Sequence, residues 1–552
     1  MQKTSDDTLS LWREEGSRLI PKNFEVFHSL VKQTKNYTQQ GKYNAAAVYA
    51  EMAAFYATGM HGGLFVSQEL EEILLTIGKN VITEDIYTQK KNTSLSSAPK
   101  HILHVITSVS SIGGHTRMLW RWIQQDNKRC HSIVITRQEQ QTEIPLILKT
   151  AVKNSGGKIY ILNSKVGGVI SWAKQLRKIA NQRDLVVLYT HNYDVIPIIA
   201  FAQKQQSPPV IFIDHADHKF WLGASIGDIF ASLRESGMRL LHKRREIETD
   251  LSVLLPIIIE PTHRSLSRSQ AKQKIGLPED SILLLSVARA VKYKTIDGIS
   301  FADAHLPLLE KYEKVFLIVV GPNNPADWAT AIQKTEGRIR VISETPNTAI
   351  FYQAADIYVD SFPFVSNTSL LEAGSYAVPL VTRNPYSDAS EILGADMPGL
   401  TGNLIQVRDI QEYIATLSHL IEDEKFRQSL GEATSKKIAE THWGNHWQQK
   451  LENLYMSAMS VPKVNRTMTA VDQMYIGEPD TLIPIVHGGN CDVDYVIQIY
   501  MGILPLSLRW QHWQRFYQKY SSRYSLSFLL PEWLYRQYLN FRLTLKNILS
   551  TK

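Results

Sequence analysis

The sequence predicts an α/β protein with two doubly wound domains in tandem and helical additions at both ends of the chain. The length of 552 residues suits two or three domains rather than one. Short apolar runs alternate with helical stretches between residues 100 and 260, and the same alternation restarts near residue 275. Such alternation is typical of a parallel sheet with helices on both faces.

The composition excludes several classes of protein. Apolar residues make up 44% of the chain and charged residues 20%, which excludes wholesale disorder. Cys130 and Cys491 are too few for a disulfide framework or a zinc cluster, and they favour a cytoplasmic location. No signal peptide is visible, and no apolar stretch reaches the roughly 20 residues of a membrane span. The net charge of +7 fits a slightly basic enzyme, an anionic substrate or an acidic membrane surface, and no motif supports nucleic acid as a partner.

Residues 1–95 are predicted to form a helical N-terminal region. Residues 44–61 are rich in strong helix formers, and Ser67 is placed to cap a further helix over residues 67–81. The small, polar residues 92–100 are predicted to form a linker.

The first α/β domain is predicted over residues 100–260. Its expected strands are short apolar runs at 101–109, 131–137, 157–164, 184–191 and 208–215. The second α/β domain is predicted over residues 275–440, after a polar, turn-rich bridge at about 265–280. Its expected strands lie at 281–289, 314–322, 338–343, 356–362 and 378–384. Open α/β sheets bind ligands outside the carboxyl ends of their strands, so two such domains predict a deep cleft between them.

The chain after residue 440 has a different texture. Residues 441–459 are predicted to form an aromatic amphipathic helix, and residues 460–552 an aromatic, basic and helical C-terminal region. That region is expected either to pack as an extra helical layer or to lie on a membrane surface, where aromatic and basic side chains act together.

Basic residues follow the first expected strand of the second domain. Arg289, Lys292 and Lys294 lie where this strand opens into a loop. Cations at the carboxyl end of a strand suit a phosphate or diphosphate, although such a cluster is also common in a solvated loop.

A second segment of this domain points to the same ligand. Asn367, Thr368 and Ser369 are expected to begin a helix, and the N-terminus of a helix favours an anion. Glu372 follows in the same helix, where a carboxylate can accept hydrogen bonds from a ribose diol. An ordinary capped helix explains this segment alone, but the two segments together favour a nucleoside diphosphate.

These residues resemble the nucleotide-sugar domain of GT-B glycosyltransferases. In that family, a strand ends in an Arg, and a Lys five positions later helps it to hold the donor diphosphate, as Arg289 and Lys294 are spaced here. The family pattern continues as EA-x-x-x-G-x-P-V-V, to which LLEAGSYAVPLVT is similar, with Ala377 in place of the second glycine. The resemblance implies that Glu372 binds the ribose.

The resemblance covers roughly residues 100 to 460 and implies a GT-B fold of two facing Rossmann-like domains. Ile342 and Glu344 fall where the family contacts the base. The segment SIGGHTRM resembles the glycine loop of the first domain, and Gly113 and Gly114 there let backbone amides approach the donor phosphates.

One position departs from the family pattern. Phe364 stands eight residues before Glu372, where many retaining members carry a second Glu. The loop FPFVSNTS is instead similar to that of O-GlcNAc transferases and bacterial protein N-glucosyltransferases, which are inverting, so both stereochemical outcomes stay open. The missing contact is expected to come from Asn367 and Thr368 with backbone amides.

Polar residues also end two strands of the first domain. His191 ends one expected strand, and His215, Asp217 and His218 end the next. A His whose pKa is roughly 6.5 is suited to deprotonate a hydroxyl, so these four residues are candidates for catalysis and acceptor binding, unless local hydrogen bonds alone satisfy them. Their spacing matches no standard metal site, and the resemblance implies no metal for the chemical step.

The resemblance implies a hexosyltransferase whose substrate is a sugar linked to a nucleoside diphosphate, UDP or GDP, with no cofactor. Its acceptor stays open among a glycan, a lipid-linked glycan and a protein, with peripheral membrane contact through the C-terminal region. Two alternatives remain, a non-catalytic GT-B scaffold and a GT-B enzyme of the nucleotide-sugar epimerase kind. Asp492 and Asp494 spell D-x-D, a metal motif of the GT-A fold, but they lie outside both α/β domains and are interpreted as chance.

Overall fold

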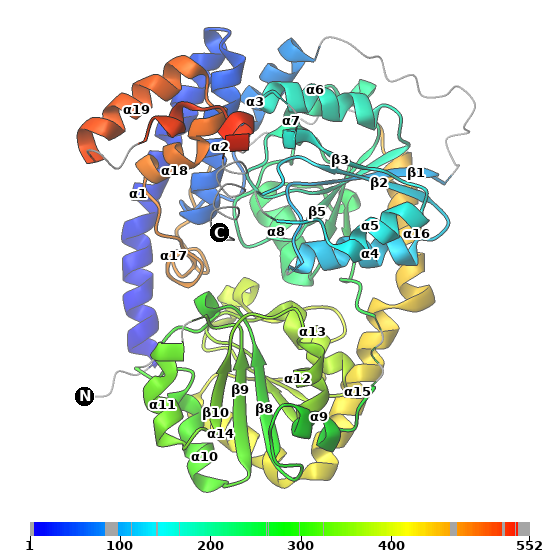
Figure 1. Ribbon diagram of the computed structural model, residues 1–552, viewed down its shortest axis with the longest axis vertical. Helices are drawn as coiled ribbons and strands as arrows, with labels where there is room; N and C mark the ends of the chain where they lie inside the picture. The colour runs from blue at the N-terminus through cyan, green and yellow to red at the C-terminus, as the bar shows by residue number, and fades with distance from the viewer. Residues whose placement is uncertain are drawn as a thin grey trace, which may run out of the picture.

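Two parallel sheets with helices packed on them form the body of the computed structural model (Figure 1). The structure describes residues 5–82, 98–111, 113–139, 142–164, 166–260, 262, 264–296, 298–323, 325–463, 472–520, 525–535 and 537–538. Most of the predicted linker, residues 92–97, lies outside the described residues, as does the end of the C-terminal region, residues 539–552.

The first sheet has the strand order β3-β2-β1-β4-β5-β6-β7, and all of its neighbouring strands are parallel. Its strands are β1 (His101–Ile106), β2 (Cys130–Ile135), β3 (Ile159–Ile161), β4 (Leu185–Tyr189), β5 (Val210–Asp214), β6 (Ile229–Ser232) and β7 (Ser252–Leu254). Strands β1 to β5 correspond to the five predicted runs. Strands β6 and β7, of 4 and 3 residues, have no counterpart among them.

The helices of the first domain pack on this sheet. They are α4 (Gly114–Gln125), α5 (Leu146–Asn154), α6 (Val169–Ala180), α7 (Ile196–Ala200) and α8 (Glu235–Arg245). The strand order reverses at β1, whose neighbours are β2 and β4. The space outside the carboxyl ends of β1 and β4 is therefore the switch point of this sheet, where doubly wound folds bind ligands.

The second sheet has the order β10-β9-β8-β11-β12-β13 and is also parallel throughout. Its strands are β8 (Ile282–Val287), β9 (Val315–Val320), β10 (Ile339–Ile342), β11 (Ile357–Val359), β12 (Leu380–Arg383) and β13 (Leu404–Val407). The switch point here lies between β8 and β11. Strand β13 has no predicted counterpart, because it lies at the edge of the sheet and only one of its side chains is fully buried.

The helices of the second domain extend to the point where the chain returns to the first. They are α9 (Arg268–Lys274), α10 (Leu306–Lys311), α11 (Ala329–Lys334), α12 (Ala349–Ala354), α13 (Asn367–Ser375), α14 (Ile410–Glu422) and α15 (Glu424–His442). The prediction of a turn-rich bridge at 265–280 is wrong for its middle part, which forms α9. Ser267 and Gln270 cap that helix reciprocally, each side chain accepting the other's backbone N–H at 3.2 and 3.0 Å.

The helix predicted over 441–459 begins later than expected. Trp443 has extended backbone angles, φ −144 and ψ 166, and separates α15 from α16 (Gly444–Ser460). Helix α16 returns to the first domain along one side of the molecule (Figure 1). There the indole N–H of Trp447 donates to the Pro256 carbonyl at 2.8 Å, and that of Trp122 donates to Tyr455 Oη at 2.7 Å. The first domain is thus completed by residues that follow the second.

The terminal regions are helical and pack together on the first domain. The N-terminal helices are α1 (Ser5–Gln39), α2 (Tyr43–Gly59) and α3 (Gln68–Val81), and the C-terminal ones are α17 (Ile483–Val486), α18 (Val493–Tyr500) and α19 (Leu506–Tyr520). Ser67 caps α3 as predicted, accepting the Leu70 N–H at 3.2 Å. Within the described ranges, none of the helices has the length and apolar character needed to cross a membrane.

Both terminal regions also reach the second domain. An apolar cluster brings together Leu9 of α1, Tyr386 after β12 and Ile483 of α17. Glu478 of the C-terminal region accepts a hydrogen bond from Ser390 Oγ of the second domain at 3.0 Å. The terminal regions therefore help to fix how the two domains face each other.

Candidate functional site

The two switch points face each other, and the predicted site residues lie at both. The glycine loop follows β1, and the start of α13 follows β11. A Cβ atom at Gly114 would stand 3.7 Å from Thr368 Oγ1, so the loop and the helix start are in near contact across the cleft. Gly113 immediately precedes α4 and has no side chain to fill this space.

The basic residues after β8 point in different directions. The side chain of Arg289 is 65% exposed, and its Nε lies 3.4 Å from a carboxylate oxygen of Glu344. Lys292 donates to the Val365 carbonyl at 2.9 Å, and burial lowers its pKa to about 8. Lys294 donates to the backbone carbonyl of Ile485 in α17. Of the predicted pair, Arg289 is therefore available to a ligand, whereas Lys294 is held by the C-terminal region.

The start of α13 is prepared for a polar ligand. The Asn367 side-chain oxygen is buried and has no hydrogen-bond partner among the described residues. Ser369 Oγ accepts from Ser366 Oγ at 3.0 Å, and the Ser366 N–H donates to both carboxylate oxygens of Asp360, at 3.1 and 3.0 Å. Burial raises the pKa of Asp360 to about 7. An unsatisfied buried acceptor calls for a donor from outside, and a bound ligand can supply one.

Glu372 forms an ion pair across the cleft. The residue is 9% exposed. Its carboxylate accepts a hydrogen bond from Arg117 Nη1 at 2.7 Å, and Arg121 Nη2 lies 3.6 Å from the same oxygen. Both arginines belong to α4 of the first domain, one and two turns after the glycine loop. The Glu372 carboxylate is thus already paired with arginines in the ligand-free protein. A ribose diol has to share this carboxylate with them or displace them from it.

A pair of histidine rings lies opposite Arg289. The rings of His115 and His215 are 3.9 Å apart between centroids and almost perpendicular, at 68°. Burial lowers the pKa of His115 well below its ordinary value, and the charges of His215 and Arg289 add to this effect. Burial also lowers the pKa of His215 to about 4. Both rings are therefore neutral at physiological pH.

The tautomer of His215 follows from the hydrogen bond that its ring makes with the Ile213 carbonyl. Its Nδ1 lies 3.2 Å from the Ile213 carbonyl oxygen, which can only accept, so the neutral ring carries its proton on Nδ1. The lone pair is then on Nε2, where it can accept a proton from another molecule. This is the arrangement that a general base requires.

His191 lies at the carboxyl end of β4 and is held by its neighbours. Its backbone N–H donates to Thr107 Oγ1 at 2.8 Å, and its Nδ1 lies 3.0 Å from Tyr193 Oη. Burial lowers its pKa, and its charge contributes to the lowered pKa values of His115 and His215. The three histidines therefore form one group at the switch point of the first sheet.

Asp217 is held by an arginine that joins the two domains. Arg234 donates to both of its carboxylate oxygens, at 2.6 and 2.8 Å, which holds the pKa of Asp217 below its ordinary range although burial alone would raise it. The same guanidinium donates to the carbonyls of Ile392 and Gly394 in the second domain, at 2.7 and 2.9 Å. Asp217 therefore positions the Arg234 side chain for its contact with the second domain, and both of its carboxylate oxygens are engaged by that side chain. His218 Nδ1 lies 3.2 Å from the same carboxylate.

Phe364 has a partner that no local pattern predicts. The ring of His487, from the C-terminal region, packs edge-on against it at 3.6 Å and lies 4.2 Å from the ring of His218. Burial lowers the pKa of His487 well below its ordinary value, and Lys292 adds to this effect. Its Nε2 has no hydrogen-bond partner within the part of the chain described. The C-terminal region thus reaches the place where the family pattern has a second Glu.

The structure brings most of the predicted residues to one cleft. Gly113 and Gly114, the start of α13 with Glu372, Arg289 with Glu344, and the histidines all lie at the two switch points. Ile342 ends β10, beside the loop that carries Glu344. Several residues at the site were outside the predicted set, among them His115, Arg117 and His487. The first two follow the glycine loop directly, but His487 has no signal in the sequence, since it reaches the site from a remote segment.

Two comparisons of sequence bear on this site. Residues 267–437 match the family model described as Glycosyl transferases group 1. A D-inositol 3-phosphate glycosyltransferase from Corynebacterium aurimucosum is 27% identical over 206 residues, which cover 35% of this chain and 47% of the relative. One from Thermobifida fusca is 23% identical over 233 residues, which cover 39% and 52%. The chain thus spans about half the length of the curated relatives it matches.

Solved structures share the arrangement of both domains. A glycosyltransferase from Rickettsia africae matches with a TM-score of 0.50 at 12% identity and covers 65% of this chain and 99% of its own. Anabaena HepE in complex with UDP matches with a TM-score of 0.50 at 14% identity and covers 64% and 98%.

The two parallel sheets with facing switch points are the fold of the GT-B class, which these two solved structures share. The predicted fold class and resemblance are confirmed. Within this fold, residues 267–437 of the second domain are similar to the group 1 glycosyltransferases, whose family model they match. The terminal helical regions lie outside this match.

Proposed function

We propose that the protein transfers a hexose-type sugar from a nucleoside diphosphate sugar to an acceptor on a glycan, a lipid-linked glycan or a protein. One observation carries this proposal. The switch points of two sheets meet, with an exposed guanidinium, Arg289, on one side and a buried neutral imidazole, His215, on the other. A reaction that releases an anion and a proton needs these two groups close together.

The donor would be held by the second domain. Arg289 and the N-terminus of α13 would bind the diphosphate, since exposed amides and the helix dipole favour an anion. Asn367 Oδ1 would accept a hydrogen bond from the sugar or ribose, and Glu372 would bind the ribose diol. Ile342 and Glu344 would contact the base. The donor is a substrate, and we assign no cofactor or metal to the chemical step.

The residues present account for the electron pair and the proton that move in the transfer step. The acceptor oxygen or nitrogen forms a bond to the anomeric carbon of the sugar, and the bond from that carbon to the diphosphate oxygen breaks. The electron pair of the broken bond stays on the diphosphate, where Arg289 stabilises the added charge. The proton of the acceptor moves to Nε2 of His215. His191 and His218 would position the acceptor.

UDP is the first nucleotide to test, since the HepE structure was solved with UDP. The experiment is a thermal-shift titration with UDP, GDP and ADP and with their sugars, with Glu372→Ala measured alongside. Stabilisation by one nucleotide, lost in Glu372→Ala, supports the donor site and names the base. The matched control is Glu422→Ala, an exposed carboxylate on α14, which should shift like the parent protein.

The same experiment separates the alternatives. A well-folded protein that no nucleotide stabilises would contradict the proposal and favour a binding scaffold. A protein that binds the nucleotide sugar and converts it without any acceptor, seen by NMR of the sugar, would favour an epimerase-like reaction.

The proposal includes a cytoplasmic enzyme with peripheral membrane contact. Cys130 and Cys491 are both free thiols. Helix α19 lies at the edge of the molecule (Figure 1). Large apolar side chains of α18 and α19 are exposed, namely Ile499, Leu506 and Trp510. Co-sedimentation with vesicles of neutral and of anionic lipid tests this contact, and recovery of the protein in the supernatant in both cases would contradict it.

A further inference from the structure

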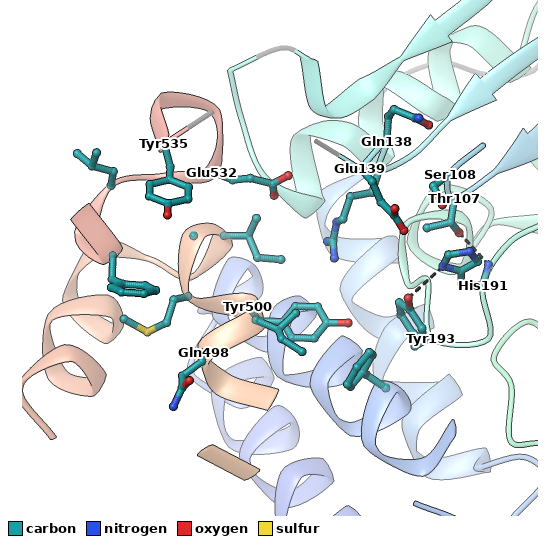
Figure 2. Close-up of a pocket in the computed structure, with 18 of the residues that line it drawn as sticks. Thr107, Ser108, Gln138, Glu139, His191, Tyr193, Gln498, Tyr500, Glu532 and Tyr535 are labelled. Atoms are coloured by element: carbon teal, nitrogen blue, oxygen red, sulfur yellow. Dashed lines mark hydrogen bonds between the residues drawn. The ribbon is translucent and has the colours of Figure 1, made fainter. Parts of the chain in front are cut away.

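A cavity lies beside His191, away from the donor residues. Its volume is about 430 Å³, and it lies between the carboxyl edge of the first sheet, helix α2 and the C-terminal region (Figure 2). This volume is within the range of sites that hold small ligands, roughly 300–1,000 Å³. Helix α18, the turns Met501–Ile503 and Leu526–Leu529, and the segment with Glu532 and Tyr535 form the wall opposite the sheet.

Aromatic rings form much of this wall. Phe55 of α2 packs edge-on against Tyr193 at 5.0 Å and against Tyr500 at 5.8 Å, and all three line the cavity. Tyr535 lines it from the C-terminal segment (Figure 2). Aromatic surfaces of this kind suit a ligand that has both apolar C–H groups and polar atoms.

Carboxylates give the cavity its polar character. Glu139 and Glu532 line it from opposite sides, and Glu532 accepts from Asn163 at 3.2 Å. Arg137 is the cation among the described residues that line it, but its guanidinium is chelated by Glu51 at 2.5 and 2.9 Å. The Glu51 carboxyl, whose pKa is raised by burial to about 7, therefore engages this guanidinium. Hydroxyl donors are favoured in such a cavity, and a phosphate is repelled.

The cavity is joined to the site of transfer through His191. This residue lines the cavity, and its charge acts on both His115 and His215. In Figure 2 the ring of His191 lies at the end of the cavity nearest Thr107 and Ser108, which follow β1. A ligand in the cavity would thus extend toward the proposed base rather than away from it.

We propose that this cavity is the acceptor site and that it binds an uncharged sugar unit, whose ring packs on the aromatic wall and whose hydroxyls donate to Glu139 and Glu532. This inference rests on the proposed transferase function. It gives the two terminal regions a role, since α2 and the segment from α18 to Tyr535 complete a site that the two α/β domains alone lack.

The test is ligand-observed NMR on the full-length protein, with glucose, galactose and N-acetylglucosamine as neutral probes and glucose 6-phosphate as the anionic one. Each probe is measured with and without the nucleotide identified by thermal shift. We expect at least one neutral sugar to bind and glucose 6-phosphate to bind at least tenfold more weakly.

Two variants of one segment locate the binding. Tyr535→Ala should weaken neutral-sugar binding at least tenfold, whereas Tyr538→Ala, whose ring is 6.3 Å from that of Tyr535 but does not line the cavity, should leave it unchanged. Ser527→Trp, which fills the cavity, should act like Tyr535→Ala. Nucleotide binding should be the same in all three variants, which shows that they are folded. Glu139→Lys should admit glucose 6-phosphate.

Three results would overturn the inference. They are nucleotide binding with no binding of any neutral sugar, equal sugar binding in Tyr535→Ala and Tyr538→Ala, and tighter binding of glucose 6-phosphate than of glucose by the unmodified protein. Sugar binding at the cavity without any nucleotide binding would instead contradict the transferase function and leave a sugar-binding site.

Discussion

The two faces of the cleft are built in different ways. The second domain supplies its face from one stretch, from Arg289 to Glu372, which lies inside the group 1 match. The first domain gathers its face from histidines that follow three different strands, His115, His191 and His215, and from a remote segment of the C-terminal region. A face encoded in one stretch can be recognised as a motif. For a face gathered from distant segments, the sequence indicates single residues such as His191 and His215, and only the folded chain shows which residues lie beside them.

The two faces also differ in charge, and the difference suits the proposed chemistry. Arg289 is exposed and stays charged, as a leaving diphosphate requires. His115 and His215 are buried, so that they stay neutral beside that charge. A protonated His on this face would repel the incoming proton and would have no lone pair to accept it. Burial therefore keeps the histidines of the first domain neutral, and exposure keeps Arg289 of the second domain charged.

The largest expected effect tests the face of the first domain. We expect His215→Ala to lower kcat about 100- to 10,000-fold, the range of general acid–base catalysis, while nucleotide affinity stays the same. His218→Ala is the matched control, because its Nδ1 already faces Asp217, and we expect a loss of less than about tenfold. A larger loss in His218→Ala than in His215→Ala would move the base to His218.

The pH dependence of kcat/KM also tests whether His215 is the base. The neutral form of His215 is the active one, and burial lowers its pKa to about 4. As the pH falls, kcat/KM should therefore hold down to about pH 4 rather than decline near the ordinary value of roughly 6.5. An acidic limb near 6.5 in the unmodified protein would show that a solvent-exposed histidine acts instead.

Asp217→Ala tests whether that residue is structural. Removing it leaves the Arg234 guanidinium buried without its carboxylate, and breaking such a pair costs about 3–5 kcal/mol. We expect a loss of this size in the free energy of unfolding by urea. Asp388→Ala is the control, because that carboxylate is 96% exposed, and it should change stability by less than about 1 kcal/mol. Unchanged stability in Asp217→Ala would return the residue to the candidates for catalysis.

Arg289→Ala tests the charged face. A hydrogen bond to a charged group contributes about 1.5–3 kcal/mol, so nucleotide-sugar affinity should fall about 10- to 150-fold in a calorimetric titration. Arg408→Ala, an arginine of the same domain that is 61% exposed, should bind like the parent protein. Lys294→Ala should cost less than Arg289→Ala, because Lys294 Nζ is engaged by the Ile485 carbonyl. The reverse order would show that Lys294 turns into the cleft on binding.

A smaller effect on nucleotide affinity is expected at the ion pair that joins the two faces. Arg117 holds Glu372 in the ligand-free protein, at 2.7 Å. If this pair competes with the ribose, Arg117→Ala should tighten nucleotide binding by about 1 kcal/mol, or roughly fivefold. Weaker binding in this variant would mean that Arg117 itself contacts the donor.

The smallest effect concerns the departure from the family pattern at Ala377. This residue has a φ of 55°, in the left-handed region that favours glycine. That conformation costs a non-glycine residue about 1–2 kcal/mol, partly offset by the entropy that a glycine loses on folding. Ala377→Gly should therefore raise the free energy of unfolding by about 0.5–1 kcal/mol. A loss of stability would show that the Ala377 methyl group makes a favourable contact.

The sequence predicted the two sheets and the donor face because both depend on local patterns. Ten of the strands correspond to apolar runs, and Arg289 and Glu372 are placed by a motif with fixed spacing. Strands β6, β7 and β13 were outside the predicted set.

Local sequence patterns could not predict contacts between remote segments. The ring of His487 beside Phe364, and the bond from Lys294 to Ile485, each join residues more than a hundred positions apart. The ion pair of Arg117 with Glu372 depends on how the two domains face each other. The spacing of residues within one segment carries no information about such contacts.

The return of α16 to the first domain has a consequence for the order in which the protein is made. A ribosome completes the strands of the second domain, up to Val407, before it has synthesised Trp447 and Tyr455. Trp122, made much earlier, therefore waits without the partners that bury it. The first α/β domain can therefore bury Trp122 against these partners only after the second domain has been synthesised, and until then this apolar ring lacks them.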